Sequence, residues 1–552
     1  MTRPLPLMLA TLALAAAPGY TQSSPPPKTT GSFSISGVVV SALTGQPLDR
    51  ADVSLHNATG ESLVSETTTG QDGNFTFTHL PASKFSLSAS RRGYIGMAYD
   101  EHEGYSTAIV TGEGLKSDGL IFRLPPRAVI RGVVSDDAGD PVQQARVSLF
   151  RVDQRSGLGN VVRGGTTTTD DTGAYEFAHL DAGNYYVAVM ATPWYATRPP
   201  PRLDATGNLR PDEQRSPLDV AYPTTFYADV TDSDSATPIP VKAGDQVQVN
   251  LTMHAVPAVH LTLQVPASAS RGFAMPQLTE EIFGQAQGMP TSTFYDWRGR
   301  QSDSDGDTTI ELSGVAPGHY SVELHGGADS SRSTVIDAAS DARIDLSQAS
   351  GMADVSGKVA MTSGEQLPDR LNISLRSSDG PSGGSERVDP DGSFAIHGVP
   401  PGNYEVWVDA AGTSLAVTHL TATGASTEGN IVRVGTAPVT ISATLVQGSA
   451  TITGFAAREG KPAPGVMVLL VPQNPGAERE LFRRDQSDSD GSFQLNRVVP
   501  GQYTLVAIED GWTLDWAHPD VIGHYLPKGI KIVVPGHAKD FAIKDKIEVQ
   551  AK

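Results

Sequence analysis

The residues best suited to bind a ligand are aromatic side chains in loops that follow a repeated hairpin. Trp194, Tyr195, Trp512 and Trp516 lie in such loops. A sugar ring presents C–H bonds to an aromatic face, and nearby Asp, Asn and His side chains can bond its hydroxyls. These four residues are therefore candidate stacking platforms for a glycan. The same rings could instead close the open end of a β-sandwich and secure the loop, and the sequence leaves both interpretations open.

Sequence patterns for catalysis are sparse. No His-Glu-x-x-His occurs, and none of the 13 histidines begins His-x-x-Glu, so the usual ligand pair of a zinc peptidase is missing. One Gly-x-Ser-x-Gly lies at 380–384, in a Gly/Ser loop that has no strand-to-helix context to expose Ser382. We therefore predict a protein that is not an enzyme, with no catalytic residue and no cofactor. An unrecognised hydrolase with its site in the second domain is kept as an alternative.

Acidic turns offer oxygen atoms that suit a hard cation. Three aspartates lie within 303–307 and three more within 485–490. Calcium prefers such ligands, but the full loop pattern with Glu at its twelfth position is missing, and Asp-Gly turns need no metal. We predict plain turns and no metal site, and calcium titration would test this.

The elements that position these loops form a repeated unit. From Asp488 to Ile508, apolar residues alternate on both sides of a break at Pro500 and Gly501, which is typical of two half-buried strands joined by a turn. Related copies have their first aromatic or apolar residue at Phe75, Tyr175, Ile310, Phe394 and Phe493. Five copies of one unit predict a repeat architecture.

A glycine lies in the middle of the strand that opens four of the five copies. The four are Gly37, Gly132, Gly357 and Gly454, and each lies 37 to 43 residues before the first aromatic of its copy. A glycine within a strand marks a bulge or the close approach of a neighbour. We expect an aromatic ring to be that neighbour. The third copy lacks the glycine and is the most divergent.

Size and charge restrict the possible functions. A chain of 552 residues is too long for one core. With 41 Lys plus Arg against 61 Asp plus Glu, its net charge is −20, which would repel nucleic acid and anionic lipid. Cysteine is absent, so disulfides and thiolate metal sites are impossible.

The N-terminus has the pattern of a targeting segment. Arg3 precedes an apolar run from Leu5 to Ala17, which is too short to span a bilayer. We expect residues 1–21 to be a signal peptide and 22–32 a Pro/Ser linker. No later segment is apolar for 18 residues, so the mature protein should be secreted or periplasmic and have no membrane span.

The predicted fold class is all-β. We expect a tandem array of about five Greek-key, transthyretin-like or Ig-like β-sandwich domains. The expected boundaries are 33–126, 127–257 with a long loop insertion, 258–349, 350–446 and 447–552. Because the linkers between them are short, we expect a semi-rigid rod.

Four sequence patterns together resemble a known family. The opening S-G-x-V, the second strand G-x-P-x-x-x-A-x-V-x-L, the segment D-x-x-G-x-[FY]-x-[FI]-x-x-[LV]-x-x-G-x-Y-x-[VL] and a trailing G-[YW] resemble the bacterial carboxypeptidase regulatory-like domain, a transthyretin-like sandwich related to carbohydrate-binding-like folds. That resemblance implies a non-catalytic exported repeat protein, because the domain is an accessory to peptidases and the peptidase domain is missing here.

The sequence leaves three functions open. The first is an adhesion, scaffold or binding protein that contacts a cell-wall or extracellular glycan, or a surface protein. The second is a dedicated array of carbohydrate-binding modules that uses Trp194 and Trp512. The third is the unrecognised hydrolase. No nucleic-acid partner is expected, and the sequence does not determine the oligomeric state.

Overall fold

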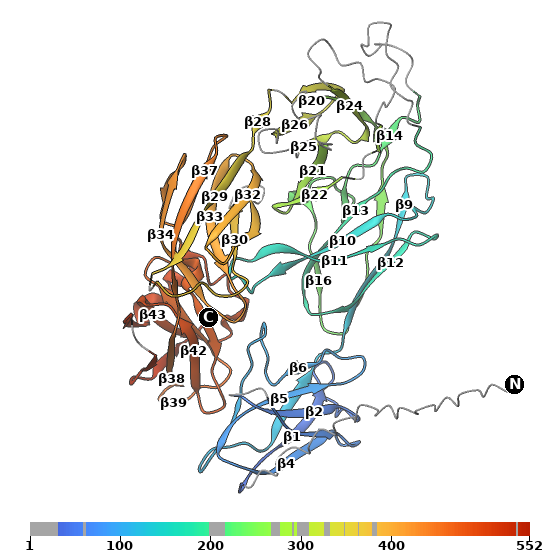
Figure 1. Cartoon of the computed structure of the whole chain (residues 1–552). Coiled ribbons are helices and arrows are strands. Elements are labelled where there is room, and N and C mark those ends of the chain that lie inside the picture. Colours follow the sequence, from blue (N-terminus) through green and yellow to red (C-terminus); the bar gives the residue numbers. More distant parts are fainter. Residues whose placement is uncertain are drawn as a thin grey trace, which may run out of the picture.

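The computed structural model describes residues 31–552 except 59–61, 198–215, 266–275, 290–291, 295–307, 325–331, 347, 363, 378–382 and 537–538. The expected signal peptide and nearly all of the linker lie outside the described residues. So do the aspartates of 303–307 and most of the Gly-x-Ser-x-Gly segment. The regular elements of the described chain are almost all strands, as predicted, and Figure 1 shows them grouped into successive sandwiches.

Sandwich 1 contains strands β1–β8, in one sheet of order β4-β1-β8 and a second of order β3-β2-β5-β6, with β7 also on β5. The strands are β1 (Phe33–Ser41), β2 (Asp52–Asn57), β3 (Leu63–Thr68), β4 (Asn74–Leu80), β5 (Ser83–Ser90), β6 (Met97–Ala98), β7 (Ile109–Thr111) and β8 (Leu120–Leu124).

Sandwich 2 contains β9–β19, with β12-β9-β17 facing β11-β10-β13-β15. The strands are β9 (Ala128–Asp136), β10 (Arg146–Asp153), β11 (Asn160–Thr168), β12 (Ala174–Leu180), β13 (Gly183–Met190), β14 (Val220–Ala221), β15 (Thr225–Phe226), β16 (Ile239–Val241), β17 (Gln246–Gln248), β18 (Leu251–Met253) and β19 (Val256–Pro257), with the 3₁₀ turn η1 (Ser233–Ser235).

Sandwich 3 pairs β23-β24-β20-β27 with β22-β21-β25-β26-β28. Its strands are β20 (Val259–Val265), β21 (Pro276–Ile282), β22 (Gln285–Gly288), β23 (Ser292–Phe294), β24 (Thr308–Val315), β25 (Gly318–Leu324), β26 (Arg332–Ala338), β27 (Ala342–Asp345) and β28 (Ser350–Gly351).

Sandwich 4 pairs β32-β29-β37-β34 with β31-β30-β33-β36-β35. Its strands are β29 (Ala353–Met361), β30 (Asn372–Ser377), β31 (Gly384–Arg387), β32 (Ser393–Val399), β33 (Gly402–Asp409), β34 (Leu415–Thr423), β35 (Ser426–Glu428), β36 (Ile431–Val434) and β37 (Val439–Gln447).

Sandwich 5 differs in that β46 pairs with both β38 and β43, which joins its two layers along one edge. Its elements are β38 (Ala450–Arg458), β39 (Lys461–Pro462), β40 (Met467–Pro472), η2 (Arg479–Leu481), β41 (Arg483–Gln486), β42 (Ser492–Val498), β43 (Gly501–Ile508), η3 (Gly511–Thr513), α2 (Pro519–Gly523), η4 (Leu526–Lys528), β44 (Ile530–Val534), β45 (Asp540–Ala542) and β46 (Ile547–Gln550).

The mid-strand glycines lie opposite aromatic residues, as expected. Gly37 pairs with Phe75, and the same cross-strand pairing recurs at Gly132, Gly357 and Gly454. A Cβ on Gly454 would lie 2.6 Å from the Phe493 ring. At Gly454 the aromatic ring therefore crosses the glycine. At the other three glycines a Cβ would first meet a backbone carbonyl oxygen of the neighbouring segment, that of Leu120, Val249 or Ile441, and at Gly357 this backbone, rather than an aromatic ring, is the close neighbour. In every case only a residue without a side chain fits.

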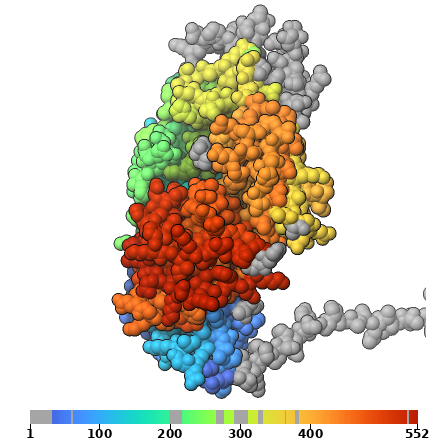
Figure 2. Space-filling model, turned by 90° about the vertical axis from the view of Figure 1, so that its left-hand side faces the viewer, coloured from blue at the N-terminus to red at the C-terminus, as the bar shows by residue number. Residues whose placement is uncertain are grey.

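The five sandwiches do not form the expected rod. Figures 1 and 2 both show that the chain turns back, so that sandwich 5 (red) lies against sandwich 1 (blue). Hydrogen bonds join the two directly, for example Ser489 N to Ala108 O at 2.9 Å. The rod expectation was wrong because linker length limits rotation at each joint but does not prevent the ends from meeting.

Candidate binding site between four sandwiches

Sandwiches 1 and 5 are joined by a partly buried ion pair. Lys84 Nζ on β5 lies 2.6 Å from Asp488 Oδ2 and donates to Ser492 Oγ at 2.8 Å. Asp488 Oδ1 accepts from Ala108 N at 3.1 Å. Asp488, one of the aspartates in the segment 485–490 that offers oxygen atoms but was predicted to form a plain turn, thus bonds to sandwich 1. Asp490 caps its own turn by accepting from Ser492 N at 3.0 Å.

Two of the four predicted glycan platforms lie in this interface rather than on the surface. Trp512 and Trp516 are only 5% and 6% exposed. The His102 ring stacks on Trp512 with centroids 5.4 Å apart and an angle of 8° between the planes. Arg484 lies over the Trp516 ring at 4.6 Å. Of the two interpretations that the sequence left open, packing describes these two tryptophans: sandwich 1 covers Trp512, and a hairpin of sandwich 2 covers Trp516, which still lines the edge of a pocket.

A hairpin from sandwich 2 completes the contact. The connection between β10 and β11 reaches sandwich 5, where Gly157 O accepts from Ala517 N at 2.8 Å. Gly157 has a φ of 70°, and a Cβ there would lie 2.4 Å from the Trp516 ring. Glycine is therefore required by both the backbone conformation and the close packing. This contact holds the neighbouring Arg155 beside sandwich 5.

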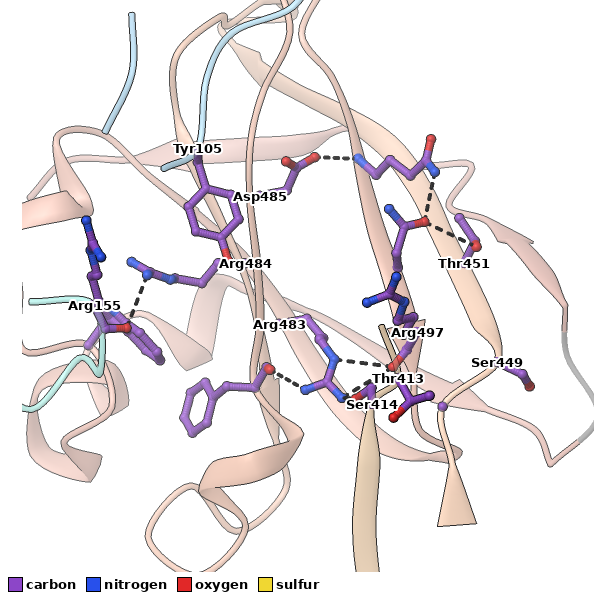
Figure 3. Close-up of a pocket in the computed structure, with 15 residues that line it drawn as sticks. Tyr105, Arg155, Thr413, Ser414, Ser449, Thr451, Arg483, Arg484, Asp485 and Arg497 are labelled. Atoms are coloured by element: carbon purple, nitrogen blue, oxygen red, sulfur yellow. Dashed lines mark hydrogen bonds between the residues drawn. The ribbon is translucent and has the colours of Figure 1, made fainter. Parts of the chain in front are cut away.

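Where these elements meet sandwich 4, they enclose a pocket of about 770 Å³. Figure 3 shows Arg155 and Tyr105 toward one end and Thr451 and Ser449 toward the other. The lining residues come from four sandwiches: Tyr105, Arg155, Thr413, Ser414, Gly448, Ser449, Thr451, Phe482, Arg483, Arg484, Asp485, Gln494, Asn496, Arg497 and Trp516. None of these described residues has an aliphatic side chain.

Two of the four arginines that line the pocket are held by protein groups. Arg484 Nη1 donates to Glu103 Oε2 at 2.7 Å, and Nη2 donates to the carbonyl of Arg155 at 3.1 Å. Arg483 donates to the carbonyls of Glu480 and Phe482 and to Ser414 Oγ. These two guanidinium groups hold the pocket wall together.

The other two arginines, Arg155 and Arg497, have exposed side chains. Within the described chain, neither guanidinium has a hydrogen bond or an ion pair. Arg497 occupies a β-bulge with a φ of 55°, and its carbonyl accepts from Arg483 Nε at 3.3 Å. Its backbone is therefore fixed, while its charged group remains available to a ligand.

Burial raises the pKa of two carboxyl groups, that of Asp485, which lines the pocket, and that of Glu480, which lies behind its wall and contacts Arg483 through its carbonyl. Burial raises the pKa of Asp485 to about 7, although a hydrogen bond from Gln494 N opposes the shift. Burial likewise raises the pKa of Glu480 to about 7. Near neutral pH both carboxyl groups are partly protonated, so they offset little of the positive charge of the arginines.

An amide group lies among the pocket hydroxyls in a fixed orientation. Asn496 Oδ1 accepts from Gln494 Nε2 at 2.8 Å and from Thr451 Oγ1 at 3.4 Å. With its oxygen engaged, Asn496 presents its amide hydrogens as donors. The pocket thus combines amide, hydroxyl, guanidinium and aromatic groups.

The other two predicted platforms remain on the surface. The Trp194 side chain is 81% exposed, and it meets the Tyr195 ring edge to face, with centroids 5.8 Å apart. Neither residue lines the pocket. Whether they stack on a glycan stays a prediction.

Of the pocket residues, the sequence singled out only Trp516, as a candidate glycan platform, and Asp485, within the acidic segment 485–490. Arg497 could have been noticed by aligning the copies, because the same bulge position holds His79, His179, Gly314 and Gly398 in the other four. No comparison between the copies indicates that Arg155 lines a ligand site. Its place depends on how sandwich 2 docks against sandwich 5, which a repeat pattern does not encode.

Two family models match this chain. Residues 34–101 and 129–210 match the carboxypeptidase regulatory-like domain, and residues 446–522 match the second beta sandwich domain of BOS complex subunit NOMO1-like proteins. Within the described chain, no helix has the length and apolar character needed to cross a membrane.

One curated relative is the serine-aspartate repeat-containing protein F of Staphylococcus epidermidis, 27% identical over 148 residues. The match covers 24% of this chain and 9% of that protein. Among solved structures, the Bacillus anthracis TIE protein is 11% identical, with 76% of each chain covered and a TM-score of 0.18. The minor pilin GBS52 of Streptococcus agalactiae is 14% identical, with 41% of this chain and 97% of that one covered and a TM-score of 0.20.

Proposed function

Since the chain is a repeat protein of carboxypeptidase regulatory-like β-sandwiches, we propose that it is a non-catalytic adhesion or scaffold protein that binds carbohydrate in the pocket between its sandwiches. The observation that carries this function is the lining of that pocket. Amide and hydroxyl groups of Asn496, Gln494, Thr451 and Ser449 surround a space of about 770 Å³, within the range of small-ligand sites.

Saccharide chemistry fits this lining better than an apolar ligand does. Sugar hydroxyls both donate and accept hydrogen bonds, and Asn496 with its neighbours offers both kinds of partner. Tyr105 and Trp516 add aromatic surface at one end. An apolar small molecule would instead need aliphatic contacts, which the described lining lacks.

An exported location supports the adhesion or scaffold role. Residues 1–21 have the expected pattern of a signal peptide, so the site would face the periplasm or the cell exterior. The relative in Staphylococcus epidermidis is itself a repeat-containing protein, which is in keeping with a scaffold.

Calorimetric titration of the mature protein with glycans selected on a glycan array would test the function. We expect Asn496→Ala to weaken binding at least fivefold, because it removes a fixed amide donor. Asn184→Ala, an exposed asparagine on β13, is the control and should leave binding unchanged. If no saccharide binds the intact protein, the function is wrong.

The dedicated binding-module array remains a second candidate because Trp194 is so exposed. Under this alternative, Trp194→Ala would weaken glycan binding and Asn496→Ala would not. Stacking on one tryptophan is worth about 1 kcal/mol or more, so the loss would be at least about fivefold. The two variants therefore separate a surface platform from the pocket.

A further inference from the structure

The pocket is a positively charged feature of a strongly acidic protein. The whole chain carries a net charge of −20, yet four arginines line this one space. Arg483 and Arg484 are engaged by protein groups. Arg155 and Arg497 are the two guanidinium groups for which the described chain offers no partner.

Nothing in the described lining neutralises these two charges. Asp485 is the one acidic residue that lines the pocket, and its Oδ2 already accepts from Gln494 N at 2.6 Å. The next ion pairs, of Arg484 with Glu103 and of Lys84 with Asp488, are complete in themselves. Two arginines are thus left to meet a negatively charged group from outside.

Guanidinium groups favour planar or multi-oxygen anions. Arginine presents its N–H donors in a fork that matches the two oxygens of a carboxylate or those of a sulfate. The adjacent amide and hydroxyl groups are arranged for a polyhydroxyl compound. An anionic sugar provides both kinds of group in one molecule.

We infer that the pocket binds a saccharide that carries negative charge, a carboxylate or a sulfate ester, with Arg155 and Arg497 contacting the anionic groups. The inference rests on the proposed function and names its ligand class. An acidic peptide fits less well, because peptides are recognised through strand edges or apolar pockets and the lining has no aliphatic side chain.

The two arginines that would contact the anion belong to different sandwiches. Arg497 belongs to β42 of sandwich 5, at the bulge. Arg155 belongs to the sandwich 2 hairpin, which is held by the bond between Ala517 N and Gly157 O and by the bond from Arg484 to the Arg155 carbonyl. Both charges face one ligand only while sandwich 2 stays docked on sandwich 5.

A matched pair of saccharides tests the charge requirement. Trigalacturonic acid and its methyl ester share one carbon skeleton, and only the acid carries carboxylates. Calorimetry on the mature protein at low ionic strength should show the acid binding at least tenfold more tightly than the ester. That preference should shrink in high salt, because ions screen it. A sulfated oligosaccharide of similar length is the second arm, and it distinguishes sulfate from carboxylate as the preferred anion.

Substitution of the two arginines tests their assignment. Arg155→Gln should weaken trigalacturonate binding at least tenfold and leave ester binding nearly unchanged. Arg497→Gly should do the same, and its fold is protected because Gly314 and Gly398 occupy this bulge in sister sandwiches with a φ of 69°. Arg131→Gln, an exposed arginine on β9, makes the same charge change elsewhere and should have no effect.

The outcomes distinguish failure of the charge assignment from failure of the carbohydrate function. If ester and acid bind equally, the charge assignment is overturned and the carbohydrate function stands. If neither saccharide binds and a glutamate oligopeptide does, the ligand is an acidic peptide and both are overturned. Equal loss in Arg131→Gln would show that only the net charge matters, and it too would overturn the assignment.

Discussion

At the scale of single residues, the buried carboxylates explain how the pocket favours anions. Asp485 is kept from water by the strands around it, so ionisation costs free energy and its pKa rises to about 7. In the unfolded chain the same group has a pKa of about 3.8. Between these two values the folded state binds the proton and the unfolded state does not. Stability therefore falls as pH rises from about 4 to about 7, and the loss is complete above 7.

Asp485→Asn should remove this dependence. The amide oxygen can still accept from Gln494 N, and no charge is buried. We expect the variant to be more stable than wild type by about 1 to 3 kcal/mol at pH 8, and equal to it near pH 4. Trigalacturonate should also bind more tightly at pH 8, because a nearby negative charge is lost. Urea unfolding at both pH values checks the stability, and an equal effect at both would refute the mechanism.

A second buried group has the opposite pH dependence. His260 on β20 contacts two carboxylates, Glu311 through Nδ1 and Asp219 through Nε2, each at 2.8 Å. The bond to Glu311 raises the pKa of His260 above 6.5; burial opposes this, and the bond to Asp219 adds to it. Its contribution to stability is complete below pH 6.5 and is lost as pH rises through the elevated value.

His260→Gln should therefore destabilise the protein most at pH 6. The difference from wild type should shrink as pH rises above the elevated pKa, because a neutral imidazole can donate to only one of the two carboxylates. His397→Gln is the control, since His397 is exposed and lies 3.1 Å from a single carboxylate of Asp354. Thermal melting across pH 5 to 9 measures both, and a pH-independent loss would mean that His260 acts only by packing.

At the scale of elements, the hairpin of every sandwich has the same backbone carbonyl accepting a hydrogen bond from a side-chain hydroxyl. The hydroxyls of Tyr185, Tyr320, Tyr404 and Tyr503 each donate to the carbonyl four residues earlier, at 2.7 to 2.9 Å. Sandwich 1 has Phe85 at this position and has no such hydroxyl. There, Thr111 Oγ1 on β7 donates to the equivalent carbonyl of Pro81 at 2.7 Å. Two different side chains thus fulfil the same requirement of the turn.

Removing the hydroxyl of Tyr404 or that of Thr111 should lower the free energy of unfolding. Tyr404→Phe leaves the Pro400 carbonyl without its partner, with an expected loss of about 1 to 2 kcal/mol. Thr111→Val leaves the Pro81 carbonyl without its partner and also removes the acceptor of Ser83 N, so its loss should be at least as large. Tyr186→Phe, on the other face of β13, is the control for loss of a tyrosine hydroxyl. Hydrogen exchange of the affected hairpin localises the change. Loss in Tyr404→Phe without loss in Thr111→Val would show that the two bonds are not equivalent.

The hairpins were predictable from sequence, whereas the pocket was not. Alternation at Phe493, Leu495, Tyr503 and Leu505 depends on local geometry, since successive strand residues face opposite sides of a sheet. The crossing of Gly454 by an aromatic ring also follows from spacing between copies. By contrast, the burial of Trp516 depends on contacts between sandwiches that are far apart in sequence. The periodic pattern of apolar residues carries no information on such docking, so the sequence of a loop that a neighbouring sandwich covers does not differ from that of an exposed loop.

At the scale of the whole molecule, the pocket exists because the chain closes on itself. Sandwiches 1 and 2 supply Tyr105 and Arg155, sandwich 4 supplies Thr413 and Ser414, and sandwich 5 supplies the rest. An extended rod would separate these groups and leave Trp512 and Trp516 exposed. Ligand binding and closure are therefore thermodynamically linked, since a ligand that contacts several sandwiches favours the arrangement in which they meet.

A disulfide across the interface tests this closure directly. Val110 N donates to Ser489 Oγ at 2.8 Å, so these two residues are in direct contact across the interface between sandwiches 1 and 5 and are the pair chosen for the cross-link. Because the natural chain has no cysteine, Val110→Cys with Ser489→Cys can form only this intramolecular bond. We expect the oxidised double variant to stay monomeric, to run faster than its reduced form in denaturing gels and to keep its affinity for the ligand. Small-angle scattering should give nearly equal radii of gyration for the wild-type and oxidised proteins. A wild-type radius much larger than that of the cross-linked form would mean that the free chain is open in solution, and a pocket built from four sandwiches would then form only on binding.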